Sequence, residues 1–414
     1  MGLVVQKFGG TSVGSVERIK KVAERILRTR EGGDQVVVTV SAMGKTTDQL
    51  VALAEEISDH PPRREMDVLL TTGEQVSIAL LSMALWESGV EACPMTGWQA
   101  GIHTNGAHGS ARIERIDPTP IQNGLDQGKI VIVAGFQGIS ETGEITTLGR
   151  GGSDTTAVAL AAALQADRCE IYTDVTGVFT ADPRIAPRAG KLSEISFEEM
   201  LELANLGAGV LHPRSVECAM THQVPLVVRS SFVEEEGTWV KEADSMEEEL
   251  NVRGVAHDLD VARIKVLGLP NRTETLTQLF QKLAEAQINV DMIVTSEHDD
   301  ERIDVAFSVQ EQEWEPAGQV IEKHQKELGH LKLLSETGLA KVSAVGAGMV
   351  THPGVAAKMF TSLSDAGIRI KMVSTSEIKI SCVIPREQAG QAVRELHTVF
   401  ELDVKESVLA TANL

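Results

Sequence analysis

The sequence predicts an α/β protein, in which a three-layer αβα domain with a mainly parallel sheet is followed by two ferredoxin-like (βαββαβ) modules. Three observations predict this class. Short β-branched runs alternate with amphipathic helical patterns in the first 230 residues, the chain beyond residue 260 repeats itself, and an acidic stretch lies between these parts. A length of 414 residues also suits two or three domains better than one.

The apolar runs in the first part predict the strands of one sheet. They read LVVQKF, QVVVTVSA, KIVIVAGFQG, CEIYTDV and VPLVVRSS. Between them, SVERIKKVAERILRTR (15–30) and EMDVLLTTGEQVSIALLSMALWESG (65–89) have the apolar spacing of helices. Nearly continuous apolar strands that alternate with helices are typical of a parallel sheet covered on both faces.

The last part of the chain contains two copies of one pattern, which begin at Lys265 and Lys341. Each copy has a strand, a loop with proline or glycine, an amphipathic helix, a second strand that ends in Thr-Ser-Glu, and a third strand. The two Thr-Ser-Glu triplets stand at 295–297 and 375–377. A tandem repeat of this kind predicts two ferredoxin-like modules side by side.

The acidic segment between the two parts lacks a long apolar run and is expected to be a linker. We therefore predict a large domain at 1–232, a linker at 233–250, a first small module at 264–335 and a second small module at 251–263 plus 336–414.

Composition argues against several classes of partner. The 38 basic residues against 59 acidic residues give a net charge of −21, without a basic stripe, so we expect no nucleic acid. The four cysteines are far apart, which argues against zinc or a disulfide framework and favours a cytoplasmic protein. The sequence shows no signal-peptide pattern, and no stretch reaches the ~18 uncharged apolar residues of a membrane span, so we expect no membrane.

A first glycine turn, VVQKFGGTSVGS, follows the first predicted strand. A P-loop would need its lysine after the glycines, whereas Lys7 precedes Gly9 and Gly10. Lys7 would instead lie at the carboxyl edge of the sheet, where the glycines let the backbone approach an anion. Thr11 and Ser12 would then begin a helix whose free N–H groups attract that anion. A tight turn with a surface lysine is the structural alternative.

A second glycine turn, LGRGGSDTTAVALAAAL, makes a phosphate site more plausible. It again places glycines, Ser153 and Asp154 directly before a helical run. Two such turns at strand ends would hold a diphosphate or triphosphate from two sides. Arg150 is placed to bind an acidic group of a substrate, and Asp154 would orient Lys7, contact magnesium or simply cap the helix.

A third segment, YTDVTGVFTADPR (172–184), follows another predicted strand. Asp174 would meet an adenine or ribose group, and Arg184 a phosphate. Thr-Asp and Asp-Pro pairs are also common in turns, so this segment is weak evidence when it is taken alone.

These segments, with VSAMGKTTDQL, LLTTGEQVS and GVLHPRSVE, resemble the signatures of the aspartokinases of the amino-acid-kinase family, in the same order. The likeness is strongest to the monofunctional, lysine-sensitive bacterial type and covers nearly all of residues 1–410. It identifies the tandem modules with the two ACT domains of that family.

The resemblance implies a kinase that transfers the γ-phosphoryl group of ATP to the side-chain carboxylate of L-aspartate. The product would be 4-phospho-L-aspartate, the first step towards lysine, threonine and methionine. A carboxylate is already a nucleophile, so positioning and charge neutralisation should dominate the catalysis.

By the same resemblance, Lys7 and Asp154 are the catalytic residues. Mg²⁺ would arrive with ATP, in possible contact with Asp154, and we expect no metal site built from protein ligands alone. The residues expected to bind ATP are Lys7, Phe8, Gly9, Gly10, Ser41, Thr173, Asp174, Phe179, Asp182, Arg184 and Gly209. The residues expected to bind aspartate are Thr47, Glu74, Arg150, Gly151, Gly152, Ser153 and Asp154.

Two positions depart from the family pattern. Many relatives carry lysine before the Val-Leu-His-Pro segment, where this chain has Gly209. Relatives with tyrosine near the base have a hydroxyl group that Phe179 lacks. We therefore expect Arg184 to provide more of the phosphate contact.

The ACT modules imply feedback by lysine, with or without threonine, bound in the seam between them; Asp291 would face the effector's ammonium group. The expected effector-binding residues are Asn289, Val290, Asp291, Met292, Ile293, His352, Pro353, Gly354, Val355, Ala356, Ile368, Arg369, Ser376 and Glu377. The modules also imply a homo-oligomer, or a hetero-oligomer with a separately made C-terminal subunit that starts near Met246.

Two other functions stay open on the sequence. A related kinase that acts on glutamate, acetylglutamate or carbamate would lack the paired tail. A non-catalytic amino-acid sensor would not need Lys7, Arg150 and Asp154.

Overall fold

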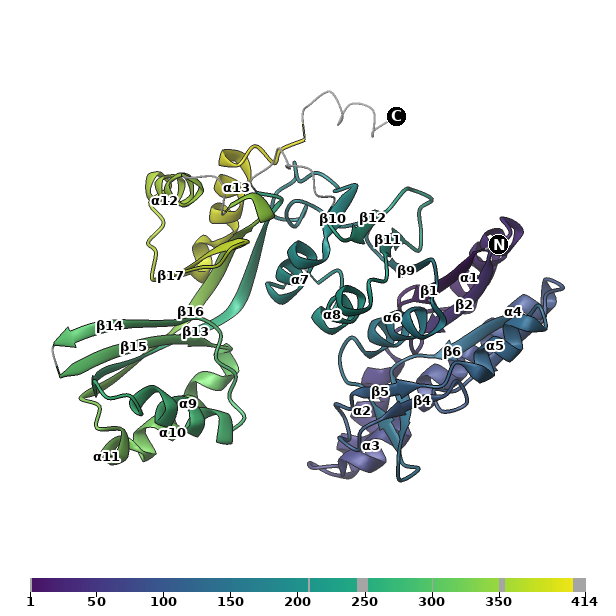
Figure 1. The fold of residues 1–414 in the computed structure, drawn as a ribbon, viewed down its shortest axis with the longest axis horizontal. Helices are drawn as coiled ribbons and strands as arrows, with labels where there is room; N and C mark the ends of the chain where they lie inside the picture. The colour runs from purple at the N-terminus through teal and green to yellow at the C-terminus, as the bar shows by residue number, and fades with distance from the viewer. Residues whose placement is uncertain (1, 208, 244–251, 300, 350–353, 405–414) are drawn as a thin grey trace. The chain divides into compact units, whose positions relative to one another are not determined.

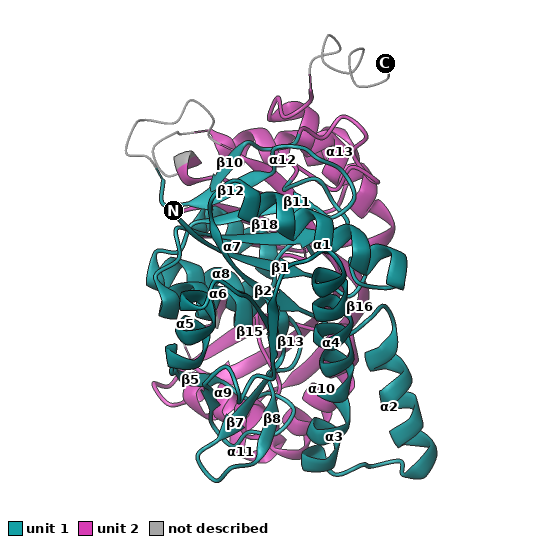
Figure 2. Ribbon diagram, turned by 90° about the vertical axis from the view of Figure 1, so that its right-hand side faces the viewer, with its two compact units in different colours: residues 1–178, 191–205, 209–245 teal, residues 179–190, 206–208, 246–414 magenta. Residues whose placement is uncertain are grey.

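The computed structural model describes residues 2–207, 209–243, 252–299, 301–349 and 354–404. The chain forms two compact units, which Figure 2 shows in different colours. The first unit consists of residues 1–178, 191–205 and 209–245, and the second of residues 179–190, 206–208 and 246–414. Each unit is described by itself below.

An eight-stranded sheet forms the centre of the first unit (Figure 1). Its strands are β1 (Leu3–Phe8), β2 (Gln35–Val40), β3 (Ala92–Met95), β6 (Ile130–Ala134), β9 (Arg168–Thr173), β10 (Glu194–Ser196), β11 (Leu226–Ser230) and β12 (Thr238–Lys241). Their order is β10-β12-β11-β9-β1-β2-β6-β3. Neighbouring strands are parallel except for the antiparallel pair β11–β12, which confirms the predicted mainly parallel sheet.

Helices cover both faces of this sheet. On one face, α1 (Val16–Glu31) and α4 (Thr72–Glu87) share an apolar core with Phe8 and its strand neighbours. Successive side chains of a strand point to opposite faces, so Lys7 points to the other face, where α6 (Gly152–Leu164) packs on β1. The other helices of the unit are α2 (Thr46–Ile57), α3 (Arg63–Leu70), α5 (Thr119–Asp126), α7 (Phe197–Asn205) and α8 (Pro213–His222).

A smaller, four-stranded sheet lies in the same unit. Its strands are β4 (Ile102–Thr104), β5 (Ile113–Ile116), β7 (Gln137–Ser140) and β8 (Ile145–Thr147), in the order β5-β4-β7-β8. The prediction of one strand over 129–138 is therefore wrong. Phe136 has a φ of 70°, a left-handed value that turns the chain from β6 in the large sheet into β7 in the small one.

The start of α1 also differs from its prediction. The helix begins at Val16, after Ser15, whose hydroxyl group accepts a hydrogen bond from the Arg18 backbone N–H at 3.2 Å. Thr11 and Ser12 lie in a turn instead, in which the Ser12 N–H donates to the Gly9 carbonyl at 2.9 Å. The helix begins later than predicted because Ser15, which is nearer to the apolar run than Ser12, is the better-placed N-cap.

The predicted linker 233–250 contains a strand, so that prediction is wrong for residues 238–241. In β12, the buried Thr238 and Val240 alternate with Trp239, which is 39% exposed. This alternation of buried and exposed residues covers only residues 238–241, so it is easily missed within an acidic stretch. Residues 244–251, with the possible internal start at Met246, lie outside the described residues.

Helices α3 and α4 together span Arg63–Glu87, although the sequence predicts one helix over 65–89. This stretch is long and apolar enough to cross a membrane by length and composition alone. In this unit α4 packs against α1 and β3 and carries the buried Glu74. Because core helices meet the same criteria, the stretch is weak evidence for a membrane span.

The second unit is built on one antiparallel six-stranded sheet. Its strands are β13 (Gly254–Pro270), β14 (Ile293–Asp299), β15 (Arg302–Val309), β16 (Lys332–Val345), β17 (Met372–Thr375) and β18 (Lys379–Pro385), in the order β14-β15-β13-β16-β18-β17. Its helices are α9 (Thr275–Glu285), α10 (Trp314–Lys323), α11 (Gln325–Leu328), α12 (Val355–Asp365) and α13 (Ala389–Val399). Both sequence repeats thus have the predicted order of strand, helix, strand and strand.

The two halves of this sheet have separate apolar cores. One core includes Phe307 beneath α9 and α10, and the other includes Met359 of α12 and Leu396 of α13. The central strand β13 serves both halves, since residues 254–258 pair with β16 and residues 262–270 pair with β15 as well. The exact domain limits given above stay predictions.

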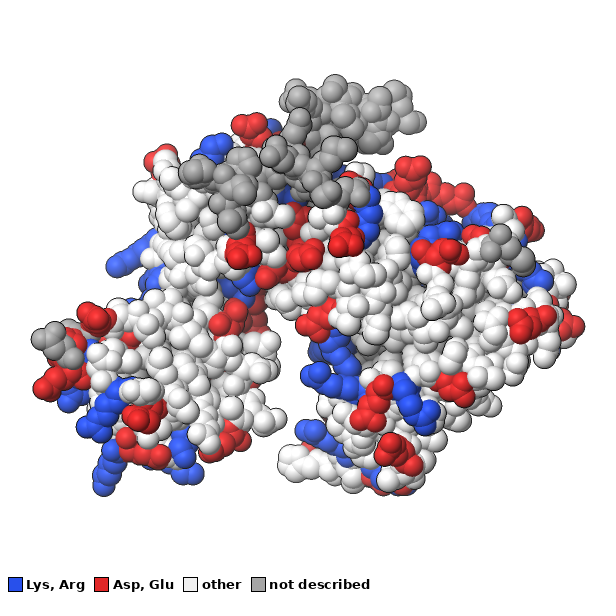
Figure 3. Space-filling view, viewed as in Figure 1, with Lys and Arg blue, Asp and Glu red and all other residues white. Residues whose placement is uncertain are grey.

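Charges of both signs lie side by side on the surface. On the face that Figure 3 shows, the lysine and arginine side chains of the described residues are interspersed with aspartate and glutamate. That face therefore lacks the broad positive area by which proteins bind a phosphate backbone.

Candidate active site

The carboxyl ends of four neighbouring parallel strands meet at one edge of the large sheet. β1 leads into Gly9, β2 into Ser41, β6 into Gly135 and β9 into Asp174. Ligands of open α/β sheets bind at this edge. Several residues predicted to bind ATP therefore lie together by topology.

Lys7 and Asp154 form an ion pair at this edge. The Nζ atom of Lys7 lies 2.6 Å from an Asp154 carboxylate oxygen, and the two side chains are only 12% and 14% exposed. Asp154 is in the first turn of α6, so it joins the β1 turn to the second glycine turn. A Cβ atom at Gly9 would lie 3.3 Å from the same Nζ atom, which shows that the ammonium group lies over the first turn.

The second glycine turn is closely packed against α8. Gly151, the N-cap of α6, has a φ of 69°, and a Cβ atom there would lie 2.1 Å from the ring of His212. Burial and the neighbouring Arg214 lower the pKa of His212. Gly152 and Ser153 follow in the first turn of α6, whose N-terminus adds positive potential for an anion.

Glu74 is a buried carboxylate at the start of α4, where it is 3% exposed. One oxygen accepts the Ala42 N–H at 3.0 Å, and the other is buried without a hydrogen-bond partner among the described residues. Burial raises the pKa of Glu74 to about 7. A buried carboxylate with a free oxygen suits a cationic ligand group.

Other predicted aspartate-binding residues are more open. Arg150 is exposed between the two glycines that precede α6, and Thr47 is half-buried in the first turn of α2. Ser41, which is predicted to bind ATP, donates its N–H to the Phe8 carbonyl at 3.1 Å. These residues belong to the same unit as Lys7 and Asp154.

The Phe8 side chain cannot contact ATP as the structure stands. It is fully buried and stacked on Tyr172, with ring centroids 4.6 Å apart and an angle of 8° between the planes. Its backbone at the end of β1 is what the nucleotide could meet. The Gly10 carbonyl accepts the Gly44 N–H at 3.0 Å, which ties this turn to the loop after β2.

Three further residues predicted to bind the nucleotide are Thr173 and Asp174, at the end of β9, and Gly209, between α7 and α8. The Thr173 hydroxyl donates to the Asp174 carboxylate at 3.1 Å, directly after β9. Gly209 is exposed and has a φ of 68°, a conformation that strains a lysine, so glycine suits the local backbone here. This gives a backbone reason for the departure from the family pattern at this position.

Phe179, Asp182 and Arg184 belong to the second unit. Arg184 binds Asp182 at 2.7 Å, and this hydrogen-bonded contact lowers the pKa of the aspartate. The arginine side chain is 89% exposed. Their predicted role in ATP binding stays a prediction.

The predicted effector residues occupy both halves of the six-stranded sheet. The Asp291 carboxylate contacts the ammonium group of Lys341, whose side chain is 8% exposed. Met292, Val355 and Ile368 are buried, Ile293, Gly354, Arg369, Ser376 and Glu377 are exposed, and Ala356 is partly buried. Asn289 and Val290 lie in the loop before β14, whereas His352 and Pro353 lie outside the described residues.

Three residues near the site were not assigned a role from the sequence. His212 and Arg214 belong to the segment GVLHPRSVE, which was quoted as a family signature. Arg214 donates to the carbonyl groups of Leu148 at 2.5 Å and Ala111 at 3.1 Å. Asp67, by contrast, gives no signal in the sequence, because its partners lie about 40 and 80 residues away.

Comparisons with known proteins agree on one family. The model of the amino acid kinase family matches residues 2–230, and a model of the ACT domain matches residues 342–400. The aspartokinase of Bacillus sp. (strain MGA3) is 60% identical over 402 residues, which cover 97% of this chain and 98% of that protein. Aspartokinase 2 of Bacillus subtilis (strain 168) is 57% identical over the same shares.

Solved structures give the same result. Escherichia coli aspartokinase III in complex with aspartate and ADP, in the R-state, is similar with a TM-score of 0.80 at 28% identity, over 96% of this chain and 99% of that one. The T-state complex of that enzyme with lysine and aspartate gives a TM-score of 0.72 at the same identity and coverage. By sequence and by fold, this chain belongs to the aspartokinases, which are phosphotransferases of the amino acid kinase family.

Proposed function

We propose that the protein transfers the γ-phosphoryl group of ATP to the side-chain carboxylate of L-aspartate and yields 4-phospho-L-aspartate. The observation that carries this proposal is the Lys7–Asp154 ion pair of 2.6 Å, placed between two glycine turns at the carboxyl edge of a parallel sheet. The names of relatives that are 57–60% identical support aspartate as the acceptor.

The main difficulty of this reaction is to bring one anion to another. The aspartate carboxylate can attack without a general base, so the site must neutralise and align the charges. Lys7 would bind the transferring phosphoryl group, and Asp154 would fix the ammonium group of Lys7. The glycine turns would donate backbone N–H groups to the phosphate oxygens.

Magnesium would be carried by ATP. The described residues contain no group of three or more His, Cys, Asp or Glu side chains arranged to hold a metal ion. Asp154 is a carboxylate at the correct edge and could contact a nucleotide-bound ion. When bound to ATP, Mg²⁺ would reduce the negative charge that the aspartate carboxylate meets.

Glu74 and Arg150 would bind the two ends of the substrate amino acid. The free oxygen of Glu74 is suited to the α-ammonium group, and the exposed guanidinium group of Arg150 is suited to the α-carboxylate. Together they would select an α-amino acid and leave its side-chain carboxylate pointing at ATP.

We further propose that lysine, with or without threonine, inhibits the enzyme through the ACT modules, as the first step towards lysine, threonine and methionine. The lysine complex of the E. coli enzyme supports this proposal. The protein would act in the cytoplasm as a homo-oligomer, or together with a C-terminal subunit of about 18 kDa that starts near Met246. Activity measured with lysine, threonine and both amino acids at millimolar concentrations tests the regulation; unchanged initial rates would exclude it.

A coupled assay of ADP release tests the reaction itself. We expect turnover with L-aspartate and much less with glutamate, acetylglutamate or carbamate. Turnover with one of these acids instead of aspartate would identify a related kinase, and no turnover with any of them would support a non-catalytic sensor.

Lys7→Ala should lower kcat by about 10³-fold or more, because it removes a positive charge from the transferring group. Lys21→Ala is the matched control, since Lys21 is a 67%-exposed lysine of the same unit, on α1. Circular dichroism should show that both variants are folded. Near-normal turnover of Lys7→Ala would remove Lys7 from the mechanism.

A further inference from the structure

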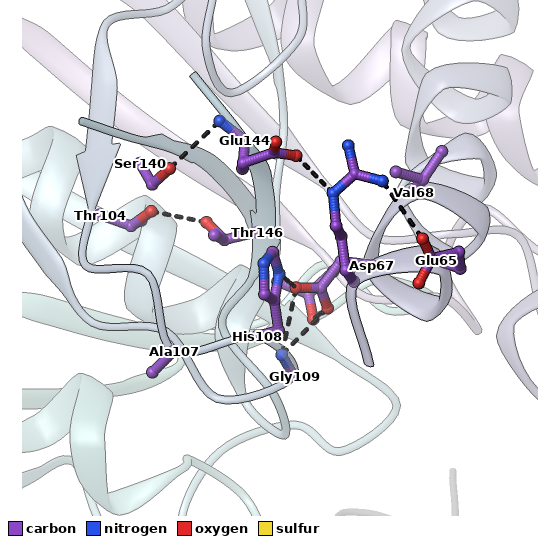
Figure 4. Close-up of polar contacts among 12 residues, drawn as sticks. Glu65, Asp67, Val68, Thr104, Ala107, His108, Gly109, Ser140, Glu144 and Thr146 are labelled. Atoms are coloured by element: carbon purple, nitrogen blue, oxygen red, sulfur yellow. Dashed lines mark hydrogen bonds and ion pairs between the residues drawn. The ribbon is translucent and has the colours of Figure 1, made fainter. Parts of the chain in front are cut away.

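Asp67, on α3, is a buried carboxylate that receives hydrogen bonds from two distant segments. Figure 4 shows its contacts with one of them, at His108 and Gly109. Its side chain is 1% exposed. One oxygen accepts the Thr147 hydroxyl at 2.5 Å and the Gly109 N–H at 3.0 Å, and the imidazole of His108 lies 2.7 Å from the other. Burying a charge is costly, and three partners at one carboxylate offset that cost.

The two segments that Asp67 joins both lead to the second glycine turn. Thr147 is the last residue of β8 and stands three positions before Arg150. His108 and Gly109 form the tip of the loop between β4 and β5, whose residue Ala111 donates its N–H to the Thr147 carbonyl at 2.9 Å. Asp67 therefore links the loop between β4 and β5 to the end of β8.

This loop touches the glycine turn itself. A Cβ atom placed on Gly149 would lie 3.0 Å from the Gly109 carbonyl oxygen, so the two backbones are in close contact. From α8, Arg214 donates to the carbonyl groups of Leu148 and Ala111, on either side of the same contact. The backbone that leads to Arg150 is thus bound from α3 and from α8.

Asp67 also lies close in sequence to Glu74, the other residue that is proposed to bind aspartate. It precedes Glu74 by seven residues, about two helical turns, on the continuous stretch formed by α3 and α4. The Thr71 N–H at the junction donates to the Asp67 carbonyl at 3.2 Å. One residue is therefore connected to the backbone of both groups that would hold aspartate.

We propose that Asp67 is a positioning residue for the proposed aspartate site. By binding Thr147 and the 108–109 loop tip, it would fix Arg150 relative to Glu74. This inference rests on the proposed function, because it assumes that Arg150 and Glu74 bind the substrate. Asp67 itself touches neither substrate nor nucleotide in this proposal. Its effect should appear in the binding of aspartate and not in the binding of ATP.

The Thr147 hydroxyl group allows a sharp test with a matched control. Thr147→Val removes the hydroxyl bond to Asp67 with little change of volume, and Thr147→Ser keeps the hydroxyl group. The neighbouring Thr146 is equally buried and bonds Thr104 at 2.5 Å, so Thr146→Val removes a hydroxyl bond that does not reach Asp67 (Figure 4).

Steady-state kinetics of the full chain should separate positioning from general damage. We expect Thr147→Val and Asp67→Asn to raise the KM for L-aspartate by about tenfold or more, with the KM for ATP changed by less than about twofold. Thr147→Ser and Thr146→Val should remain near the wild-type value. An equal rise in Thr146→Val, or equal rises in both KM values, would overturn the proposal.

Hydrogen exchange gives a second readout that does not depend on activity. Amide exchange in a peptide that spans residues 148–152 should be faster in Thr147→Val than in Thr147→Ser or Thr146→Val. Unchanged exchange would overturn the proposal even if KM changes. If the wild-type protein shows no aspartate-dependent turnover, the proposed function fails, and the exchange experiment still decides whether Asp67 holds the glycine turn.

Discussion

At the scale of single residues, Glu74 is the buried carboxylate that is proposed to bind the ammonium group of the substrate. Its carboxylate is 3% exposed, and its raised pKa of about 7 results from burial, against the lowering effect of the backbone hydrogen bond from Ala42. An ammonium group bound at its free oxygen would stabilise the ionised form. Ligand binding and deprotonation of Glu74 are therefore coupled.

This coupling predicts that aspartate binds more weakly as the pH falls. Only ionised Glu74 attracts the ammonium group, so below about pH 7 the KM for aspartate should rise, by up to about tenfold per pH unit. The measurement is kcat/KM for aspartate between pH 5.5 and 8.5.

Glu74→Gln should have a raised KM that no longer follows this titration, whereas the exposed Glu87→Gln at the end of the same helix should keep the wild-type profile. A profile of Glu74→Gln that coincides with the wild type would show that another group titrates.

The residues of the site differ in how well a sequence can reveal them. Lys7 and Asp154 stand in glycine turns whose pattern points to phosphate, and the resemblance to the aspartokinases then assigned them their catalytic roles. Asp67 stands in an ordinary helical run, and its role depends on partners that the folding of distant segments brings to it. Phe8 is predicted to bind ATP, and because its side chain stacks on Tyr172, only its backbone is left to meet the nucleotide.

At the scale of elements, the junction of β8, the glycine turn and α6 is the most constrained part of the site. Gly151 needs both a left-handed backbone and the absence of a side chain, since its Cβ would lie 2.1 Å from the His212 ring. The His212 ring, at the N-terminus of α8, therefore limits where α6, the helix that carries Asp154, can begin.

Gly151→Ala should destabilise the protein more than Gly143→Ala does. Both glycines have a positive φ, of 69° and 81°, so both substitutions carry about 1 kcal/mol of backbone strain. At Gly143 a Cβ meets no atom within 4 Å, so the excess at Gly151 measures the clash with His212. Thermal unfolding of the two variants provides the comparison. Equal shifts in Tm would show that His212 and α8 move away from the added Cβ atom and remove the clash.

Elements whose pattern is local could be predicted, and those that depend on pairing with distant strands could not. The run 129–138 is mostly apolar, yet the left-handed Phe136 divides it between two sheets. In β12, four residues join the large sheet from an acidic stretch because pairing with β11 buries Thr238 and Val240. Tertiary pairing decided both cases, and no local propensity reports it.

At the scale of the whole chain, the internal repeat made the regulatory half predictable. Two copies of one pattern predicted two similar modules, and the six-stranded sheet has the corresponding order, with β13 and β16 at its centre. Which side chains meet in that sheet did not follow from the repeat. The Asp291 carboxylate, predicted to face an effector, contacts Lys341 of the other copy.

This contact predicts a competition between Lys341 and an amino-acid effector. If Asp291 binds the ammonium group of the effector, the effector must first displace the ammonium group of Lys341. Lys341→Met removes that competitor, and the Asp291 side chain is 52% exposed, so its charge stays in contact with water. The lysine concentration for half-inhibition should therefore fall several-fold, with little change in the activity measured without lysine.

Lys332→Met, an exposed lysine at the start of the same strand, is the control and should not change the inhibition. A titration of initial rate with lysine compares the three proteins. Half-inhibition of Lys341→Met at the wild-type concentration would mean that effector binding does not require displacement of Lys341. Asp291 would then have a structural role, in the ion pair with Lys341, and other residues between the two ACT modules would bind the effector.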